Sequence, residues 1–372
     1  IPPLVKVSGT LRFFLKKVRD SFELYVSPVN INPLKPSLPI STPPDYARRL
    51  AEKLGTFYTQ GMPQDTSALS AGIFNDDEYR QQAIYVLEEE LKMFDHEFRR
   101  FEKGFFFFYF SSLDLNCHTF WRTMDSSHPL YTDRLAEKQG DFIPWLYGQM
   151  DKAVGTAMKR MSPDTLLMIV SDHGFGSFRR QFNLNSWLMD NGYASPRKGI
   201  SRGHSSFWGD TDWTDTRAYG LGINSLYLNI RNREPDGIVP AEKAEKLGGE
   251  IASRLKSVRD PSTGAPVIAN VYAPDTYSGP FSGKAPDLVI GYAPNYRASW
   301  DTILNKYPEE HITDNLDPWS GDHALDSSFM SGTLISADKL KITEPALYDI
   351  APTILARFGI PRAEGMTGRN LL

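Results

Sequence analysis

The feature that most constrains the fold is an apolar strand, a helix and a second apolar strand, in that order along the chain. Residues 105–113 form the longest apolar run, bracketed by Lys103 and Asp114. An amphipathic helix is predicted over residues 141–161, and residues 166–170 form a short continuous apolar run. Such a run is typical of a strand buried on both faces of a parallel sheet. The order therefore predicts a βαβ unit with a right-handed crossover.

The rest of the chain alternates in the same way between strand and helix patterns. Asn75 followed by Glu78 fits a capping box and predicts the start of a long helix. Between residues 178 and 233 the chain is rich in Gly, Ser, Trp and Asn without a long period, which indicates an irregular insertion with short strands. Further helices are predicted at residues 76–101, 241–258 and 346–358, and further strands at residues 267–272, 288–292 and 332–336.

Composition limits the chemistry that this chain can perform. A formal charge of −4 over 372 residues gives no long-range attraction to nucleic acid or anionic lipid, so any phosphate recognition must be local. The single cysteine, Cys117, excludes an intramolecular disulfide and a thiolate-rich metal cluster. The 105–113 run is about half of the roughly 20 residues that a membrane helix needs. We therefore expect no membrane segment and no nucleic-acid polymer as a partner.

Residues of the types that bind metal ions lie close to three of the predicted strands, after two of them and before the third. Asp114 and His118 are four residues apart after the first apolar run, a spacing that one helical turn brings together. Asp172 and His173 come directly after the run at residues 166–170, and Gly174 allows a close or left-handed backbone there. His323 precedes the strand predicted at residues 332–336. Carboxylate and imidazole ligands suit zinc or manganese.

Each of these pieces is weak alone. The Asp-His pair also occurs at Asp95 and His96, on an exposed face of a predicted helix. An isolated pair of Asp114 and His118 would equally fit a salt bridge along a helix. The order of the three sites and their placement at strand ends favour a shared metal centre, because open α/β sheets gather their ligands at the carboxyl ends of strands.

The ordered motifs resemble the alkaline phosphatase superfamily. They are Asp-x-x-x-His at residues 114–118, Ser-Asp-His-Gly-Phe-Gly at residues 171–176, Gly-x-His at residues 321–323 and the closing Tyr-Asp-Ile-Ala-Pro-Thr-Ile-Leu at residues 348–355. Within the superfamily the chain looks most like the type I phosphodiesterase and nucleotide pyrophosphatase branch. The resemblance spans nearly the whole chain and is strongest from Asp114 onward.

The resemblance implies a fold and a set of ligands. The implied fold is an α/β sandwich with a central, mostly parallel sheet flanked by helices, plus irregular insertions. Asp114, His118 and His323 would bind one metal ion, and Asp172 with His173 would bind a second. Zinc is the expected metal, with manganese as the alternative.

The resemblance also implies residues that we do not find here. In this family the second ion takes another Asp and a nucleophilic Ser or Thr from just after the first core strand. No such segment is recognisable here, so we expect the nucleophile upstream of Ile1 and expect residues 1–372 alone to be inactive. Residues 1–104 would form an accessory segment with a leading helix, and residues 105–372 the metal-binding core with its insertion at about 178–233.

The implied function is metal-dependent hydrolysis of phosphate diesters or pyrophosphates in a small-molecule substrate. Two alternatives remain: a phosphotransferase like phosphoglycerate mutase, and a non-catalytic module that retains the core fold. A phosphotransferase of this kind would require a cluster of Arg and Lys around a small carboxylate substrate. The basic residues here are scattered along the sequence, which disfavours this alternative. Many relatives are exported, so the resemblance points to an extracytoplasmic or periplasmic location, and oligomeric state stays open.

Overall fold

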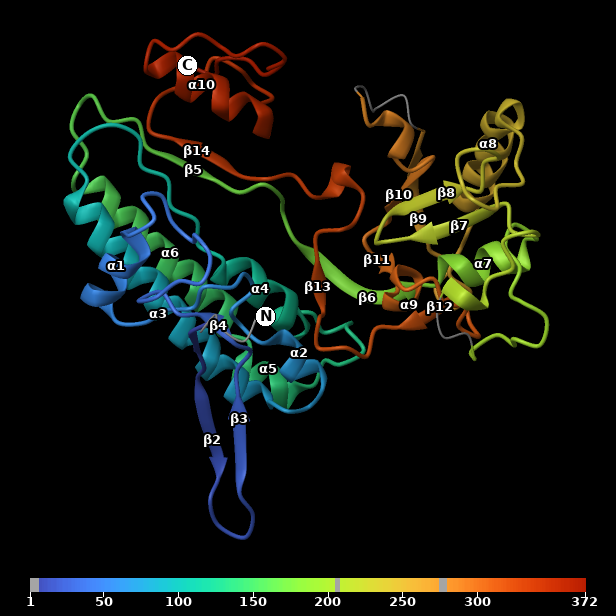
Figure 1. Ribbon diagram of the computed structural model, residues 1–372, viewed down its shortest axis with the longest axis horizontal. Helices are drawn as coiled ribbons and strands as arrows, with labels where there is room; N and C mark the ends of the chain where they lie inside the picture. The colour runs from blue at the N-terminus through green and yellow to red at the C-terminus, as the bar shows by residue number, and fades with distance from the viewer. Residues whose placement is uncertain (1–6, 205–207, 274–279) are drawn as a thin grey trace. The chain divides into compact units, whose positions relative to one another are not determined.

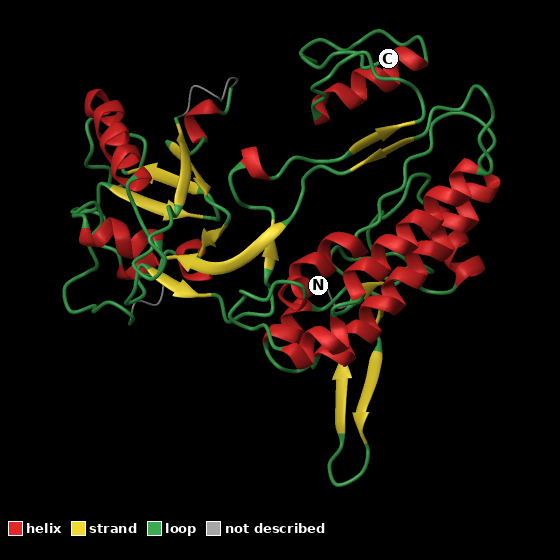
Figure 2. Ribbon diagram, turned by 180° about the vertical axis from the view of Figure 1, so that it is seen from behind, coloured by secondary structure: helices red, strands yellow, loops and turns green. Residues whose placement is uncertain are grey.

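The computed structural model describes residues 7–204, 208–273 and 280–372, and the chain divides into two compact units. One unit comprises Ile1–Met124, Thr132–Lys159 and Asp317–Trp319, and the other comprises Asp125–Tyr131, Arg160–Leu316 and Ser320–Leu372. Figure 1 labels the elements along the chain, and Figure 2 distinguishes helices from strands. No helix among the described residues is both long and apolar enough to cross a bilayer.

The first unit is mainly helical. Its longest helix, α3, confirms the capping box: the Asn75 side chain accepts from the Glu78 backbone, and the Glu78 side chain accepts from the Asn75 backbone. Acidic residues in its first turn and basic residues in its last suit the helix dipole. The helices are α1 (Tyr46–Leu54), α2 (Thr66–Ser70), α3 (Asp76–Arg100), α4 (Ser112–Phe120), α5 (Asp133–Gln139) and α6 (Phe142–Met158).

Aromatic side chains join the helices of this unit. Phe120 of α4 is fully buried, and its ring centroid lies 5.8 Å from that of Tyr79 on α3 and 4.9 Å from that of Phe142 on α6. An antiparallel hairpin extends away from these helices in Figure 1 and packs at its base through Phe14 and Tyr25 against Phe74. The strands here are β1 (Gly9–Thr10), β2 (Phe13–Lys17), β3 (Glu23–Val26) and β4 (Asn30–Ile31).

The strand predicted in the apolar run at residues 105–113 does not form: α4 begins at Ser112, and residues 105–110 form no strand. The segment is extended but pairs with no strand in the described part of the chain, and exposure alternates along it. Phe106, Phe108 and Phe110 pack their rings against Phe94 of α3, whereas the aromatic residues between them are exposed. The prediction was wrong because a helix covers one face of the segment and no neighbouring strand covers its edges.

The second unit contains the sheets. One sheet has the order β7-β8-β10-β9, a second has β11-β6-β12 with β13 also paired to β6, and β14 pairs with β5. The strands are β5 (Met168–Val170), β6 (Gly176–Phe182), β7 (Ala218–Leu221), β8 (Ser225–Leu228), β9 (Ile268–Tyr272), β10 (Leu288–Tyr292), β11 (Asn295–Ala298), β12 (Ile312–Asp314), β13 (Gly321–Asp322) and β14 (Leu334–Ser336). The helices are α7 (Leu184–Asp190), α8 (Ala241–Lys256), α9 (Trp300–Ile303) and α10 (Ile350–Arg357).

A continuous apolar core lies between these sheets and helices. Ile251 and Leu255 of α8 are fully buried with Ile290 and Tyr292 of β10. Residues 178–233 supply part of the same core through β6, α7, β7 and β8, so this region is more regular than its composition predicted. Gly222, at φ 73°, allows the tight turn between β7 and β8.

The α/β class is confirmed, but the expected parallel sheet is not seen. Among the paired strands of the described residues, β6 with β11 runs parallel and the other pairs run antiparallel. The strand predicted at 166–170 forms as β5, yet its partner β14 is antiparallel and Val170 is 42% exposed. A continuous apolar run therefore did not mean burial on both faces here.

Candidate metal centre

Helix α4 brings Asp114 and His118 onto one face, as their spacing predicts. The Nε2 atom of His118 lies 3.8 Å from Oδ2 of Asp114. The His118 side chain is nearly buried at 3% exposure, whereas that of Asp114 is 30% exposed. The imidazole stacks on the ring of Trp319 at 3.7 Å, within the same unit. Stacking and burial fix the ring orientation, so this pair can present one nitrogen and one carboxylate to an ion.

The loop after β5 carries Asp172 and His173. Ser171 fixes its start, because its backbone N–H donates to the Thr333 carbonyl at 2.9 Å and its Oγ accepts from the Thr333 N–H at 2.8 Å. The Gly174 N–H donates to the Met330 carbonyl at 3.1 Å. A Cβ added at Gly174 would lie 2.9 Å from the Ser331 carbonyl oxygen. The glycine is therefore needed for close backbone approach, one of the two roles that the sequence allowed.

The hydrogen bonds of His173 define which ring nitrogen can bind a cation. Nδ1 lies 3.0 Å from the Gly174 carbonyl oxygen, and a carbonyl only accepts, so Nδ1 carries the proton of that bond. Of the two neutral tautomers, the one with its proton on Nδ1 has its lone pair on Nε2, which lies 3.5 Å from Oδ1 of Asp172. This is the tautomer that a metal-ligating histidine needs.

His323 follows β13 and lies beside His173. The two imidazole centroids are 3.6 Å apart with 16° between the ring planes, and Phe175 meets the His323 ring edge-on at 5.6 Å. Strand β13 pairs with β6 in the register Gly321 with Ser177 and Asp322 with Gly176. This pairing brings together two loops that are about 150 residues apart in the sequence.

The five predicted ligands thus form two groups. Asp172, His173 and His323 lie together in the second unit, and Asp114 lies with His118 in the first. Two stacked imidazoles and an adjacent carboxylate fit a pair of divalent ions, since ligands of two ions about 4 Å apart lie close to one another.

Two ion pairs near these loops escaped the sequence reasoning. Arg179 of β6 forms a two-bonded pair with Asp125, with N–O distances of 2.6 Å, and Ser177 also donates to Asp125. Burial opposes ionisation of Asp125, but the bonds from Arg179, Ser177 and Ser127 outweigh it and hold the pKa of this carboxyl below its usual range. Arg297 of β11 pairs with Asp322, the residue before His323. No spacing pattern links either partner to its mate.

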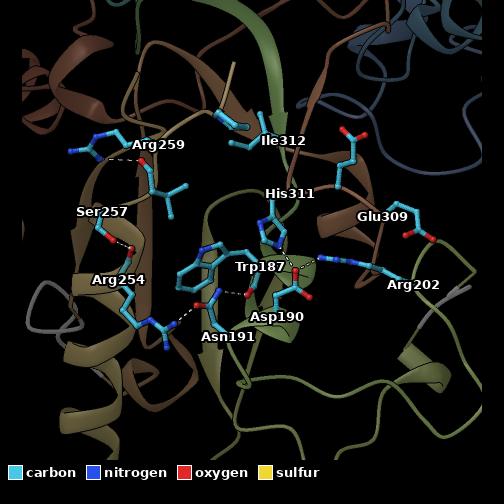
Figure 3. Close-up of a pocket in the computed structure, with 13 residues that line it drawn as sticks. Trp187, Asp190, Asn191, Arg202, Arg254, Ser257, Arg259, Glu309, His311 and Ile312 are labelled. Atoms are coloured by element: carbon cyan, nitrogen blue, oxygen red, sulfur yellow. Dashed lines mark hydrogen bonds and ion pairs between the residues drawn. The ribbon is translucent and has the colours of Figure 1, made fainter. Parts of the chain in front are cut away.

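A cavity of the second unit lies elsewhere. It has a volume of about 700 Å³, and none of the predicted ligands lines it. Figure 3 shows His311 and Arg202 both directed at Asp190, with His311 Nε2 and the Arg202 guanidinium 2.8 and 2.7 Å from the carboxylate. Arg254 and Arg259 lie on the opposite side in this view. The candidate ligands of the second unit therefore lie outside this cavity.

Comparison with known proteins agrees with the motifs. The mixed helices and sheets, with imidazoles and carboxylates beside β5 and β13, define an α/β protein of the alkaline-phosphatase-like class. The chain belongs to the type I phosphodiesterase / nucleotide pyrophosphatase family, whose model matches residues 24–311 of the 372. The matched range includes Asp114, His118, Asp172 and His173 and ends before His323. No curated protein matches the chain.

Proposed function

We propose that this protein hydrolyses phosphate diesters or pyrophosphates at a centre of two divalent metal ions. The observation that carries the proposal is the stacked pair of His173 and His323, with Asp172 beside it, in a member of this family. The two imidazoles come from different loops and their ring centroids lie 3.6 Å apart, so both could serve one metal centre. The family is one of enzymes that act on phosphodiesters and pyrophosphates.

The ligands are assigned as the sequence motifs imply. Asp114, His118 and His323 would hold one ion, each offering one carboxylate oxygen or imidazole nitrogen. Asp172 and His173 would hold the other. Imidazole nitrogens with carboxylate oxygens suit zinc, and manganese is the alternative.

When bound, two divalent ions supply positive charge for the phosphoryl oxygens and lower the pKa of an attacking hydroxyl. This chain's own residues would orient that centre. The Gly174 carbonyl oxygen accepts from Nδ1 of His173, which would leave Nε2 to bind the ion. Trp319 holds the His118 ring by stacking. The nucleophilic Ser or Thr and the further Asp that the resemblance implies are not assigned to residues of this chain.

The test is turnover of a chromogenic diester, bis(p-nitrophenyl) phosphate, by the full-length protein that contains this chain. We expect hydrolysis that a chelator abolishes and added zinc or manganese restores. The matched control is His204→Ala, because His204 lies on an exposed loop and bonds locally with Ser201. His173→Ala should lose at least 100-fold in kcat/KM, which is of the size that removing a transition-state interaction causes. Turnover that survives complete chelation would sink the proposal.

A further inference from the structure

A buried ion pair stands directly behind the turn that carries His323. The Arg297 Nε lies 2.9 Å from Oδ2 of Asp322, and the two side chains are only 1% and 3% exposed. A charge withdrawn from water to this degree is costly unless it is paired with an opposite charge. Arg297 and Asp322 therefore hold each other in a single arrangement.

Two aromatic rings pack against the guanidinium of Arg297. It lies 5.0 Å from the centroid of Phe178 on β6 and 4.2 Å from that of Trp300 in α9. A planar guanidinium stacks on aromatic faces in a way that an ammonium group cannot reproduce. Strand β11, which carries Arg297, also runs parallel to β6 and is paired with it. The cation is thus part of the rigid sheet.

Asp322 connects Arg297 to the backbone of His323. Its second oxygen, Oδ1, accepts from the backbone N–H groups of His323 and Ala324, both at 2.8 Å. These two bonds define the turn from which the His323 side chain projects. Asp322 also pairs with Gly176 in the ladder between β13 and β6. The turn that carries His323 is therefore tied to the strand that begins three residues after His173.

We propose that Arg297 and Asp322 are positioning residues: they hold the backbone of His323 so that its imidazole stands beside that of His173 at the spacing two ions require. This inference rests on the proposed function, because it takes His323 to be a metal ligand. Neither residue touches the ion itself. Their role is to set the affinity of the ion that His323 binds.

The test measures zinc affinity in the full-length protein by equilibrium dialysis of the metal-free form against zinc chloride. Asp322→Asn keeps an acceptor oxygen for the two N–H groups but removes the charge that holds Arg297. Arg297→Lys keeps the positive charge and loses the planar fork, and it is the milder variant. The matched control is Asp260→Asn. Asp260 is also fully buried, and it forms an ion pair at 2.7 Å with Arg180 of β6, the strand that pairs with β13. It also accepts a hydrogen bond from the Ser262 N–H at 2.8 Å.

We expect Asp322→Asn to weaken binding of one of two zinc ions by about 10- to 100-fold, the usual loss when the support of a metal ligand is removed. Arg297→Lys should weaken the same ion by less, and the other ion should be held as in the wild type. Asp260→Asn should lower the unfolding temperature without weakening either ion. A merely structural role predicts the same zinc affinities for Asp322→Asn and Asp260→Asn, which would overturn the inference.

His323→Ala separates this inference from the proposed function. If His323→Ala loses no zinc, the ligand assignment fails and takes the inference with it. If His323→Ala loses one ion while Asp322→Asn and Arg297→Lys hold both as tightly as the wild type, only the positioning role is wrong. Should Asp322→Asn fail to fold, the Arg297→Lys measurement decides.

Discussion

At the scale of single residues, the sequence identified ligand types but not the contacts that hold them. Asp172 and His173 could be found because they directly follow an apolar run, and Asp114 and His118 because their spacing matches a helical turn. Arg297 could not be found, because its partner Asp322 is 25 positions away and nothing in the local sequence marks a buried cation. Pairing over such distances depends on strand register, which local patterns do not contain.

Asp125 provides a residue-scale prediction on pH. Its folded pKa is lowered, so the stability that it contributes is present above the unfolded value of about 3.9 and is lost as pH falls through the lower folded value. Asp125→Asn should lower the free energy of unfolding by about 2 kcal/mol at neutral pH, since bonds to charged groups are removed. The difference from the wild type should shrink below about pH 4. Urea unfolding across this pH range measures it.

Asp151→Asn is the matched control, because Asp151 is exposed on α6 and no hydrogen bond or ion pair of its side chain is seen in the described structure. The free energy of unfolding of Asp151→Asn should equal that of the wild type within about 0.5 kcal/mol at each pH. If Asp125→Asn lowered the free energy of unfolding by the same amount at neutral and at acidic pH, the ionised Asp125 carboxylate would not be the stabilising form.

At the scale of elements, capping and periodicity predicted the helices well, and four of the five predicted strands form, as β5, β9, β10 and β14. Helix α3 begins where Asn75 and Glu78 place it, and α8 covers most of the predicted range 241–258. The aromatic run at 105–110 failed because strand formation requires a paired neighbour, whereas a helix satisfies its own backbone. Local sequence therefore specifies a helix more completely than a strand.

The cap of α3 gives the element-scale prediction. Asn75→Ala removes the acceptor for the Glu78 N–H and should lower the free energy of unfolding by about 1 kcal/mol. Glu88→Ala, an exposed site on the same helix, should change it by less than about 0.5 kcal/mol. Urea unfolding monitored by circular dichroism compares the two. Equal effects of both substitutions would mean that the cap does not stabilise α3.

At the scale of the whole molecule, the α/β class and the family were predictable and the topology was not. The order of motifs from Asp114 to His323 is a property of the sequence and led to the family whose model matches residues 24–311. The largely antiparallel pairing was not expected, because a continuous apolar run is typical of a parallel sheet, yet β5 has such a run and pairs antiparallel with β14. The stacked histidines depend on that pairing, since β13 runs antiparallel to β6.

Metal binding should appear as stability of the whole molecule. An ion that binds only the folded form stabilises it by about 2.7 kcal/mol at a concentration 100-fold above its Kd. Zinc should therefore raise the unfolding temperature of the full-length protein, and chelation should reverse the rise. Calcium, which prefers six to eight oxygen ligands, should raise it much less because imidazole is prominent here. An equal rise with calcium would argue against a centre built around imidazoles.

The most direct measurement is zinc-edge anomalous diffraction from crystals of the full-length protein grown with zinc. We predict two anomalous peaks about 4 Å apart, one at bonding distance from His323, Asp114 and His118 and the other at bonding distance from Asp172 and His173. A single peak away from these side chains, or no peak beside the stacked imidazoles, would contradict the two-metal centre.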